Sequence, residues 1–596
     1  FSDEKIRIIK AGTHHQELGL PWDQPVPEEL WIKVAEYCDN DVIATEAAFN
    51  YLEADWTARQ ILADLAGMTV NDTTNSLTTK IIFGGNREPH DEFCYRDLSK
   101  PVNDISDPML GFLRDVCPDM MRGTHDGHGT GPKSILPYFP GYKYEAGIST
   151  YRGEKVSEGG YVYAEPGMHV MVALLDVSSM HPHSTIAEVL FGVRYTTAYR
   201  DIVEGRVSIK HEAWDEVDHM LDGKLRPYIQ KVKNGEMTSG QLANALKTAI
   251  NSVYGLTAAG FDNPFRDPRN KDNIVAKRGA LFMVDLKHAV QERGFTVAHI
   301  KTDSIKIPNA TPEIIDFVME FGKKYGYTFE HEATYEKMCL VNNSVYIAKY
   351  LSPEMCEKKY GYAPKDNKKH ADKPWTATGT QFAVPYVFKT LFSKEKVDDN
   401  DMREVFSTST ALYLDMNESL PDVTNEEADM KKLESKYKKG KLSDVSFEES
   451  CKPLAEVIHG GHDYHFVGRV GEFCPVKPGK GGGVLVREKD GKYYAASGTT
   501  GYRWLEAETL MKNSGSNVTV IDSETGKQKD VAGMQLISGN ENIIDRSYYD
   551  ALVDAAVESI SKYGDFEWFV SDEPPIDIPE FMNVPEGGPD ELPFVV

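Results

Sequence analysis

Length, composition and charge exclude several classes of protein. The sequence has 596 residues and a formal net charge of −26 at pH 7, and this length predicts three or more packed units. Its seven cysteines form no Cys-x-x-Cys pair and no zinc-ligand cluster, which favours a reducing, cytoplasmic location. No apolar run approaches the roughly 18 residues of a membrane span, so no membrane partner is expected. The acidic balance disfavours indiscriminate binding to polyanions but leaves a locally basic groove open.

The predicted elements change character in blocks along the chain. Residues 28–66 are predicted to be helical, and residues 101–165, rich in Gly, Pro and aromatic residues, to be irregular or short-stranded. Strand-like and helix-like segments alternate over residues 168–307. Many Gly and β-branched residues predict a small β-rich module within 465–545. The acidic, Pro-rich end of the chain is predicted to be a loose tail.

The segment HVMVALLDVSSMHPHSTIAEVLFG carries the first chemical signature. A buried strand is predicted from Val170 to Leu175, and it ends on Asp176. SSMHPHS then turns the chain, and the capping-box spacing of Thr185 and Glu188 predicts that a helix starts there. An aspartate at a strand end beside helix N-terminal amides suits a metal ion that carries phosphates.

TSGQLANALKTAINSVYG predicts an amphipathic helix with a capping box at Thr238 and Gln241 and a stop at Gly255. Its apolar stripe consists of Leu242, Ala245, Leu246, Ala249, Ile250 and Val253. At 100° per residue the opposite face carries Asn244, Lys247, Asn251 and Tyr254. This face offers a cation, amides and an aromatic hydroxyl, which suit a triphosphate and a base.

FTVAHIKTDSIKI predicts a β-hairpin, because strand-forming residues flank Thr302, Asp303 and Ser304. Asp303 is expected at the hairpin tip, where a carboxylate is held rigidly. If the fold brings Asp303 to Asp176, the two carboxylates suit phosphoryl transfer by a pair of Mg²⁺ ions. A lysine would then neutralise the charge that develops on the phosphates.

In this order and spacing, the three segments resemble the B-family DNA polymerases, and most closely their bacteriophage members with short fingers. DVSSMHP resembles D-x-x-S-L-Y-P, KTAINSVYG resembles K-x-x-x-N-S-x-Y-G, and KTDS resembles the D-T-D-S hairpin. The resemblance implies an α+β fold shaped as a right hand of palm, fingers and thumb. It implies template-directed addition of dNTPs to a primer 3′-OH on primer-template DNA, with release of pyrophosphate. The implied cofactor is two Mg²⁺ ions, for which Mn²⁺ can substitute.

The same resemblance assigns roles to individual residues. Asp176 and Asp303 would be the catalytic metal ligands, with the Val177 carbonyl assisting. Ser178, Ser179 and Met180 would cradle the phosphates with their backbone amides. The other implied nucleotide contacts are His181, Arg226 (or Lys231 or Lys233), Lys247, Asn251 and Tyr254, and the implied primer or DNA contacts are Lys301, Thr302, Tyr346 and Lys349.

Three departures from the family pattern bear on function. Lys301 stands where the family carries an aspartate, and His181 stands where a tyrosine excludes ribonucleotides. Ser344 replaces the lysine of the Lys-x-Tyr segment that ends at Tyr346, and Lys349 is expected to compensate from nearby. Catalysis is expected to survive because the indispensable ligand implied by the resemblance is Asp303.

The front of the chain resembles the third exonuclease motif of the family, Tyr-x-x-x-Asp, through Tyr37 and Asp41. No Asp-x-Glu pair precedes Tyr37, so we expect an exonuclease remnant without proofreading. The sequence starts at Phe1 rather than methionine. The missing part is therefore expected either to have been removed or to lie on a separate chain.

The implied domain boundaries follow these motifs. They are residues 1–66 for the C-terminal remnant of a 3′-5′ exonuclease domain, 67–164 for a linker or N-terminal-type region, 165–215 and 262–375 for the palm, 216–261 for helical fingers, and 376–596 for a thumb with an inserted β-rich module at about 455–545 and the loose tail.

Two other classes of function fit part of the pattern. A polymerase-like scaffold would bind DNA without chemistry, as the departures at Lys301, His181 and Ser344 suggest. A two-metal nuclease would also use paired carboxylates, although it needs no triphosphate-binding helix. The Lys-rich stretches 357–375 and 431–441 fit either duplex-phosphate contacts or solvated surface.

Overall fold

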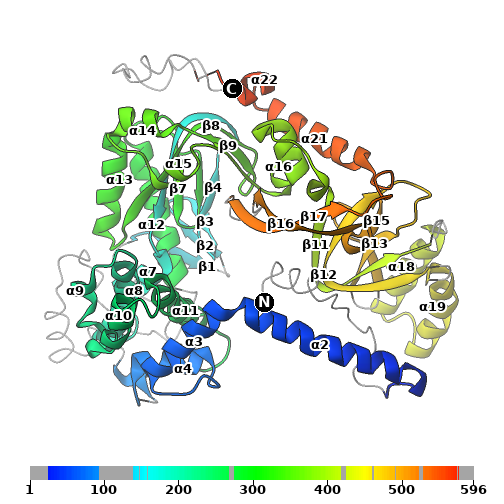
Figure 1. Ribbon diagram of the computed structural model, residues 1–596, viewed down its shortest axis with the longest axis horizontal. Coiled ribbons are helices and arrows are strands. Elements are labelled where there is room, and N and C mark those ends of the chain that lie inside the picture. Colours follow the sequence, from blue (N-terminus) through cyan, green and yellow to red (C-terminus); the bar gives the residue numbers. More distant parts are fainter. Residues whose placement is uncertain are drawn as a thin grey trace. The chain divides into compact units, whose positions relative to one another are not determined.

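The computed structural model divides into two compact units by its internal contacts, shown together in Figure 1. Unit 1 comprises Phe1–Tyr51 and Thr378–Glu558, and unit 2 comprises Leu52–Ala377 and Ser559–Val596. The residues that the structure describes are 25–86, 88–92, 139–145, 148–157, 159–266, 274–417, 424–459, 462–489, 492–521, 526, 528–573 and 575.

Unit 2 mixes helices and strands. Its helices are α3 (Glu53–Ala66), α4 (Thr74–Phe83), η2 (Pro89–Glu92), α7 (Met180–Ala187), α8 (Gly192–Lys210), α9 (Trp214–Val217), η4 (Met220–Gly223), α10 (Arg226–Lys233), α11 (Ser239–Thr257), α12 (Ile274–Gln291), α13 (Pro312–Lys324), α14 (Pro353–Tyr360), α15 (Lys365–Lys369) and α22 (Phe566–Val570). Its strands are β1 (Lys143–Glu145), β2 (Ile148–Tyr151), β3 (Glu154–Val156), β4 (Val162–Ala164), β5 (Gly167–Val177), β6 (His299–Lys301), β7 (Ser304–Ile307), β8 (Phe329–Leu340), β9 (Tyr346–Tyr350) and β10 (Trp375–Thr378).

Unit 1 is also mixed. Its helices are η1 (Glu28–Leu30), α2 (Trp31–Tyr51), α16 (Thr380–Ala383), α17 (Pro385–Phe388), η5 (Lys389–Ser393), η6 (Asp399–Met402), α18 (Thr424–Lys438), α19 (Asp444–His459), α20 (Ala507–Leu510) and most of α21 (Arg546–Ser561). Its strands are β11 (Glu404–Asp415), β12 (Tyr464–Val476), β13 (Val484–Lys489), β14 (Lys492–Ala495), β15 (Arg503–Glu506), β16 (Met511–Ile521) and β17 (Gln528–Leu536). None of the described helices is long and apolar enough to cross a membrane.

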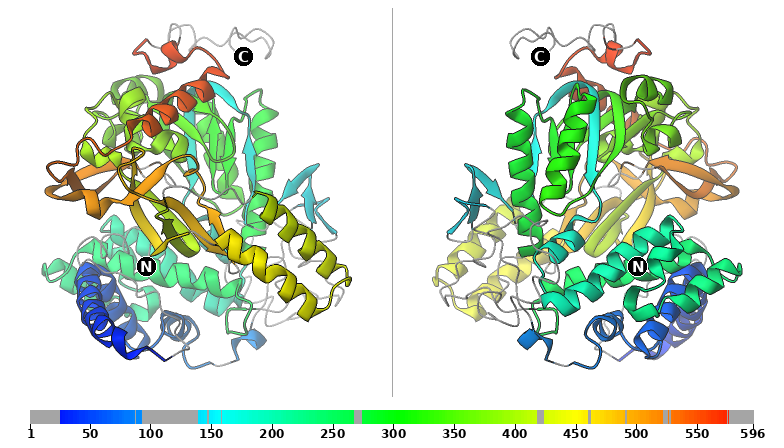
Figure 2. Two further views of the ribbon diagram at one scale, coloured as in Figure 1. Left: turned by 90° about the vertical axis from the view of Figure 1, so that its right-hand side faces the viewer. Right: turned by 90° about the vertical axis from the view of Figure 1, so that its left-hand side faces the viewer.

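The seven-stranded sheet of unit 2 runs in the order β10-β9-β8-β5-β7-β6-β4, and the pairings around β5 are antiparallel. Successive residues of a strand point to opposite faces, and β5 is apolar on both. Ala173, Leu175 and Val177 join the main core, to which α12 and α13 also contribute. Figure 2 shows these helices standing along one side of the sheet. Val172 and Leu174 join a second cluster on the opposite face.

The predicted helix over the TSGQLANALKTAINSVYG segment is confirmed as α11. The Thr238 side chain accepts from the Gln241 N–H and the Gln241 side chain accepts from the Thr238 N–H, so the capping box is present. All six residues of the predicted stripe are buried, against α3, α4 and α8. The predicted stop at Gly255 is wrong, because Leu256, 4% exposed, extends the stripe and the helix continues to Thr257.

The predicted helix start at Thr185 is also wrong. Helix α7 already begins at Met180, and the Thr185 hydroxyl donates to the His181 carbonyl inside it. Glu188 caps the C-terminal end instead and forms an ion pair with Arg278 of α12, in which both side chains are fully buried. A buried ion pair is retained only when its partners are well oriented, so this contact fixes α7 against α12.

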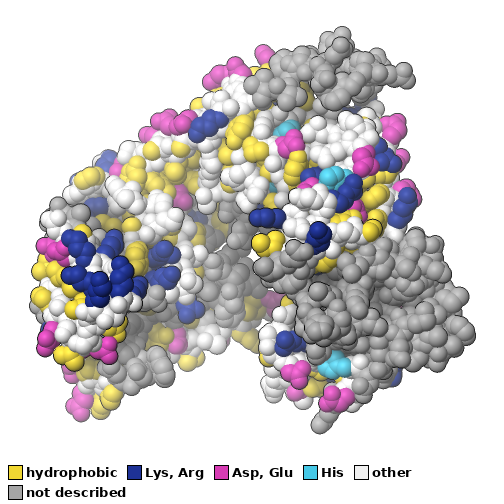
Figure 3. Space-filling model, turned by 180° about the vertical axis from the view of Figure 1, so that it is seen from behind, with side chains coloured by type: hydrophobic (Ala, Val, Ile, Leu, Met, Phe, Trp, Pro, Cys, Tyr) yellow, Lys and Arg dark blue, Asp and Glu magenta, His cyan; other side chains and the backbone are white. Residues whose placement is uncertain are grey.

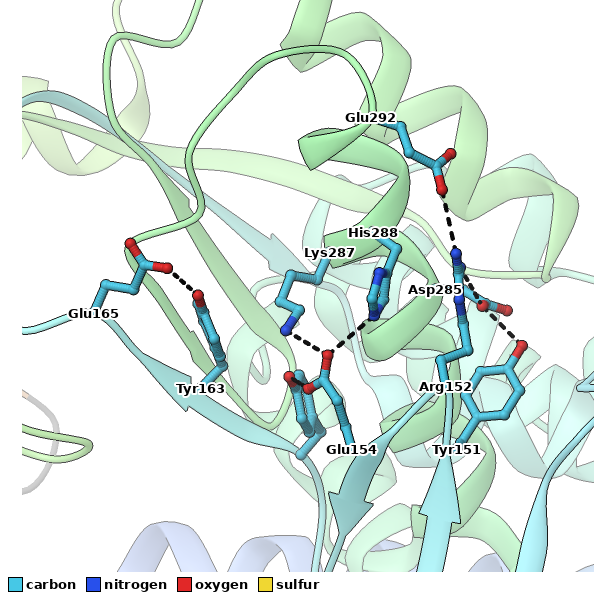
Figure 4. A network of polar contacts seen from close by, with 10 residues as sticks. Tyr151, Arg152, Glu154, Tyr163, Glu165, Asp285, Lys287, His288 and Glu292 are labelled. Carbon is cyan, nitrogen blue, oxygen red and sulfur yellow. Dashed lines mark hydrogen bonds and ion pairs between the residues drawn. The ribbon is translucent and has the colours of Figure 1, made fainter. Parts of the chain in front are cut away.

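A polar network attaches the small β1–β3 sheet and β4 to α12, as Figure 4 shows. The Tyr151 hydroxyl donates to Asp285 at 2.8 Å, and Arg152 bridges Asp285 and Glu292. Glu154 binds both Lys287 and His288. The Tyr161 hydroxyl also donates to Glu154, so the chain leading into β4 is anchored by side chains from α12.

The expected secondary structure of the other blocks is confirmed in the described residues. Residues 28–66 are helical, with a division at Leu52 that puts α2 in unit 1 and α3 in unit 2. Short strands occupy the described part of 101–165, and β12 to β17 form a five-stranded and a two-stranded sheet with β11. Most of the acidic tail, from residue 576 on, lies outside the described residues, and the predicted domain boundaries stay predictions.

Glu404 at the start of β11 is a buried carboxyl group in unit 1. Its Oε1 atom has no hydrogen-bond partner among the described residues, and burial raises its pKa from 4.5 to about 8. Between these two values the folded chain keeps a proton that the unfolded chain has lost, so stability falls as the pH rises through this window.

The variant Glu404→Gln removes this proton linkage. We expect the difference in melting temperature between Glu404→Gln and wild type to shift in favour of the variant from pH 5 to pH 8. The reason is that wild type loses roughly 1.4 kcal/mol of unfolding free energy per pH unit in this range. The exposed Glu508 of α20 supplies the control, since Glu508→Gln should shift the melting temperature equally at each pH. A difference between Glu404→Gln and wild type that is constant with pH would contradict the assignment.

Candidate active site

The fold brings Asp176 and Asp303 to neighbouring strands, although they lie far apart in the sequence. The Val177 N–H donates to the Asp303 carbonyl at 2.8 Å, and Asp176 stands opposite Ser304 in the β5–β7 register. Both aspartates are half-buried. The predicted hairpin is confirmed, with Thr302 and Asp303 between β6 and β7.

The tip of this hairpin is strained. Thr302 has a φ of 59°, a region that β-branched residues rarely adopt. Its N–H donates to the Tyr161 carbonyl at 3.0 Å, and a Cβ at Gly160 would lie 3.2 Å from the Thr302 side chain. The segment anchored by Glu154 therefore holds Thr302 in place. Strain that the surroundings maintain is typical of functional sites.

Two further charged residues, Lys306 and Glu332, act electrostatically on Asp303, and neither was predicted from the sequence. Lys306 of β7 is 4% exposed, and burial lowers its pKa to about 8, against the opposing charges of Asp176, Glu332 and Asp303. Burial and the charge of Glu332 raise the pKa of Asp303, while Lys306 acts in the opposite direction. The only sequence signal was a lysine at an alternate position of a strand otherwise built from isoleucine.

The turn after β5 is locked by hydrogen bonds. The Ser178 N–H donates to the Thr328 carbonyl at 2.9 Å, and the expected place of Ser178 in a phosphate cradle stays a prediction. Ser179 has a φ of 54°, and its carbonyl accepts from both the N–H and the Nδ1 of His183. Met180 packs so closely on α12 that a Cβ at Gly279 would lie 2.5 Å from its sulfur.

His181 and Tyr254 meet across α7 and α11. Their ring centroids are 4.4 Å apart with an interplanar angle of 31°. Burial lowers the pKa of His181, which favours the neutral imidazole. On the same face of α11, Lys247 and Asn251 are exposed. The structure therefore joins the predicted helix face to the predicted loop through an aromatic contact.

A group of cations lies beside Lys247, and most of it was not predicted. Partial burial and the positive charges of Arg206, Lys365 and Lys247 lower the pKa of Lys210, at the end of α8. Nε of Arg206 is buried without a hydrogen-bond partner among the described residues. We call Arg206, Lys210, Lys247 and Lys365 the basic cluster. A sequence signal existed in the i, i+4 spacing of Arg206 and Lys210.

Arg226, predicted to share this role, is engaged elsewhere. Its Nε donates to the carbonyl and the Oδ2 of Asp218, both at 3.0 Å, on an exposed surface. In the described part of the chain, no hydrogen bond or ion pair joins Arg226 to the basic cluster. The alternatives Lys231 and Lys233 belong to the last turn of α10.

The predicted primer contacts fall on different surfaces. Tyr346 is 9% exposed within the second cluster, and Lys301 is exposed at the end of β6. Lys349 stands three positions after Tyr346 in β9, so it points to the opposite face. There it is 8% exposed and pairs with Asp572 at 3.0 Å. Its expected compensation for Ser344 stays a prediction.

The donor set at the aspartate pair fits Mg²⁺ in its chemistry. Carboxylate and carbonyl oxygens are the ligands that Mg²⁺ prefers, and it is commonly bound by one or two carboxylates together with substrate phosphates and water. Within the described residues, no group of three or more His, Cys, Asp or Glu side chains is arranged as a complete metal centre. The pair would therefore need ligands from a substrate.

The other predicted features belong to unit 1. Tyr37 and Asp41 are half-buried on α2, as the i, i+4 spacing predicts, and their exonuclease role stays a prediction. The 431–441 stretch forms the end of α18 and the turn after it, and its six lysines are exposed. Figure 3 shows Lys and Arg side chains gathered densely at the left of the view.

Comparisons with known proteins give only weak likeness to solved structures. No family model matches the sequence, and no curated protein matches it. Among solved structures, the family B DNA polymerase from the hyperthermophilic archaeon Pyrobaculum calidifontis is similar with a TM-score of 0.33 and 12% sequence identity. The match covers 90% of this chain and 57% of that chain. A TM-score this low assigns no function.

The close approach of Gly160 to Thr302 can be tested by Gly160→Ala. The added methyl group would meet Thr302 at 3.2 Å, and the φ of 140° disfavours alanine, so we expect a loss of roughly 1 to 3 kcal/mol of unfolding free energy. The control is Gly159→Ala, whose Cβ would meet no atom within 4 Å. Equal melting temperatures for the two variants would contradict the close approach.

Proposed function

We propose that the chain is a template-directed DNA polymerase that adds dNTPs to a primer 3′-OH by two-metal-ion phosphoryl transfer. The proposal rests on the three motifs in their order and, above all, on the pairing of Asp176 with the Asp303 hairpin. Two carboxylates fixed on adjacent strands beside a basic helix end suit a metal-bound triphosphate. The phage-type assignment and the right-hand architecture belong to the same proposal.

The proposed mechanism assigns a different role to each group of residues. Asp176 and Asp303 would hold two Mg²⁺ ions, which supply activation of the primer oxygen and stabilisation of the leaving pyrophosphate. The basic cluster would bind the β- and γ-phosphates, and Lys247 would neutralise charge as it develops. His181 and Tyr254 would line the nascent base pair through the aromatic pair that they form. Tyr346 and Lys301 remain proposed primer contacts.

Asp303→Asn tests the carboxylate pair. We expect primer extension on a recessed duplex to fall by at least about 100-fold, because several kcal/mol of transition-state stabilisation would be lost. The matched control is Asp316→Asn on the exposed surface of α13, which should extend primers like wild type. Undiminished extension by Asp303→Asn would remove Asp303 from the site.

The basic cluster is tested by Lys210→Ala and Lys247→Ala. Each loses one charge-assisted contact to phosphate, so we expect the KM for dNTPs to rise about tenfold or more while duplex binding stays unchanged. Arg226→Ala is the comparison, since Arg226 already pairs with Asp218. A larger KM effect in Arg226→Ala than in Lys210→Ala would favour the sequence-based assignment instead.

Two observations favour a second candidate, a polymerase-like scaffold that binds DNA without chemistry. Lys301 replaces an acid of the hairpin, and the described residues hold no complete three-ligand metal centre. This function would show salt-sensitive primer-template binding with no Mg²⁺-dependent extension. A two-metal nuclease would release mononucleotides rather than pyrophosphate, so the products of one reaction separate all three functions.

A further inference from the structure

Lys306 is the charged residue that the proposed mechanism leaves unused. The strand register places it on the same face of the sheet as Asp176. In the β5–β7 register Lys306 stands opposite Leu174, and Ser304, two residues earlier, stands opposite Asp176. Because opposite residues and residues two apart share a face, the side chains of Lys306 and Asp176 lie on the same face of the sheet.

The ammonium group of Lys306 is enclosed on that face. Its Nζ lies 3.3 Å from Nδ1 of His299 and 5.0 Å from the ring centroid of Tyr346. Nε2 of His299 is engaged with the Asn343 carbonyl at 3.1 Å. A lysine that is 4% exposed must find compensating charge nearby. Burial and the charge of Lys301 lower the pKa of Lys306, whereas the negative charges of Asp176, Glu332 and Asp303 raise it.

We propose that Lys306 is an internal counter-cation of the aspartate pair. Its charge holds Asp176 and Asp303 together in the absence of metal and opposes the binding of divalent cations to them. The free protein therefore binds metal weakly, and a metal ion arrives with the triphosphate, which supplies the missing ligands and charge. Lys306 is thus a positioning residue. This inference rests on the metal site of the proposed function.

The test measures metal affinity directly, without substrate. Mn²⁺ is titrated into wild type, Lys306→Met and Lys306→Gln, and free Mn²⁺ is followed by electron paramagnetic resonance. We expect both variants to bind Mn²⁺ at least about threefold more tightly, a conservative figure for removing one nearby unit charge at an effective dielectric constant of about 20. Adding Asp303→Asn should abolish the gain, because the aspartates are the site.

Lys337→Met is the matched control. Lys337 is also a fully buried lysine of unit 2, but its Nζ donates to the carbonyls of Trp568 and Ser571. Its replacement should lower stability without changing Mn²⁺ affinity, which separates loss of packing from loss of charge. Unchanged or weaker Mn²⁺ binding in both Lys306 variants would overturn the inference. If the wild type never extends a primer and the Lys306 variants still bind Mn²⁺ more tightly, the inference about Lys306 holds and the polymerase proposal fails.

Discussion

The antiparallel pairing of β5 with β7 and β8 is the constraint on which the rest of unit 2 depends. Strand β5 is apolar on both faces, so its register cannot slip by one residue without moving a buried set of side chains to the wrong side. That register fixes where the strand ends, and therefore where Asp176 and the turn after it stand. The Val177 N–H then holds the Asp303 carbonyl, so the backbone of Asp303 lies next to the end of β5 as a result of strand pairing.

Several charged side chains of this framework are buried, at a cost in free energy. The Glu188–Arg278 pair fixes α7, and Lys306 of β7 is buried on the face of the sheet that carries Asp176. Each of these groups costs free energy to bury and is tolerated only with oriented partners. Strain at Thr302 is a cost of the same kind, and the contacts from Gly160 and Tyr161 maintain it. These costs concentrate around one end of β5, where the proposed chemistry would occur.

The lysines illustrate why nearness in sequence is a poor guide to nearness in a sheet. Lys349 follows Tyr346 by three residues and lies on the other face, where it binds Asp572. Lys306 belongs to another strand and lies 5.0 Å from the Tyr346 ring. Once the segment is taken as a strand, the alternation of its side chains already places Lys349 on the face opposite to Tyr346. Finding Lys306 required the order of strands, which no local pattern encodes.

The sequence by itself determined the local elements. It predicted the capping box at Thr238, the apolar stripe of α11 and the turn that carries Asp303, because caps, helical periodicity and turn residues act over a few positions. Boundaries failed where tertiary packing extended or replaced a local signal, as at Leu256 and Thr185. Only the tertiary structure decided that Asp176 meets Asp303, that Lys210 joins Lys247 and that Lys306 lies on the face of the sheet that carries Asp176. Strand order, register and helix packing join residues far apart in the chain, so their outcome depends on the whole of unit 2.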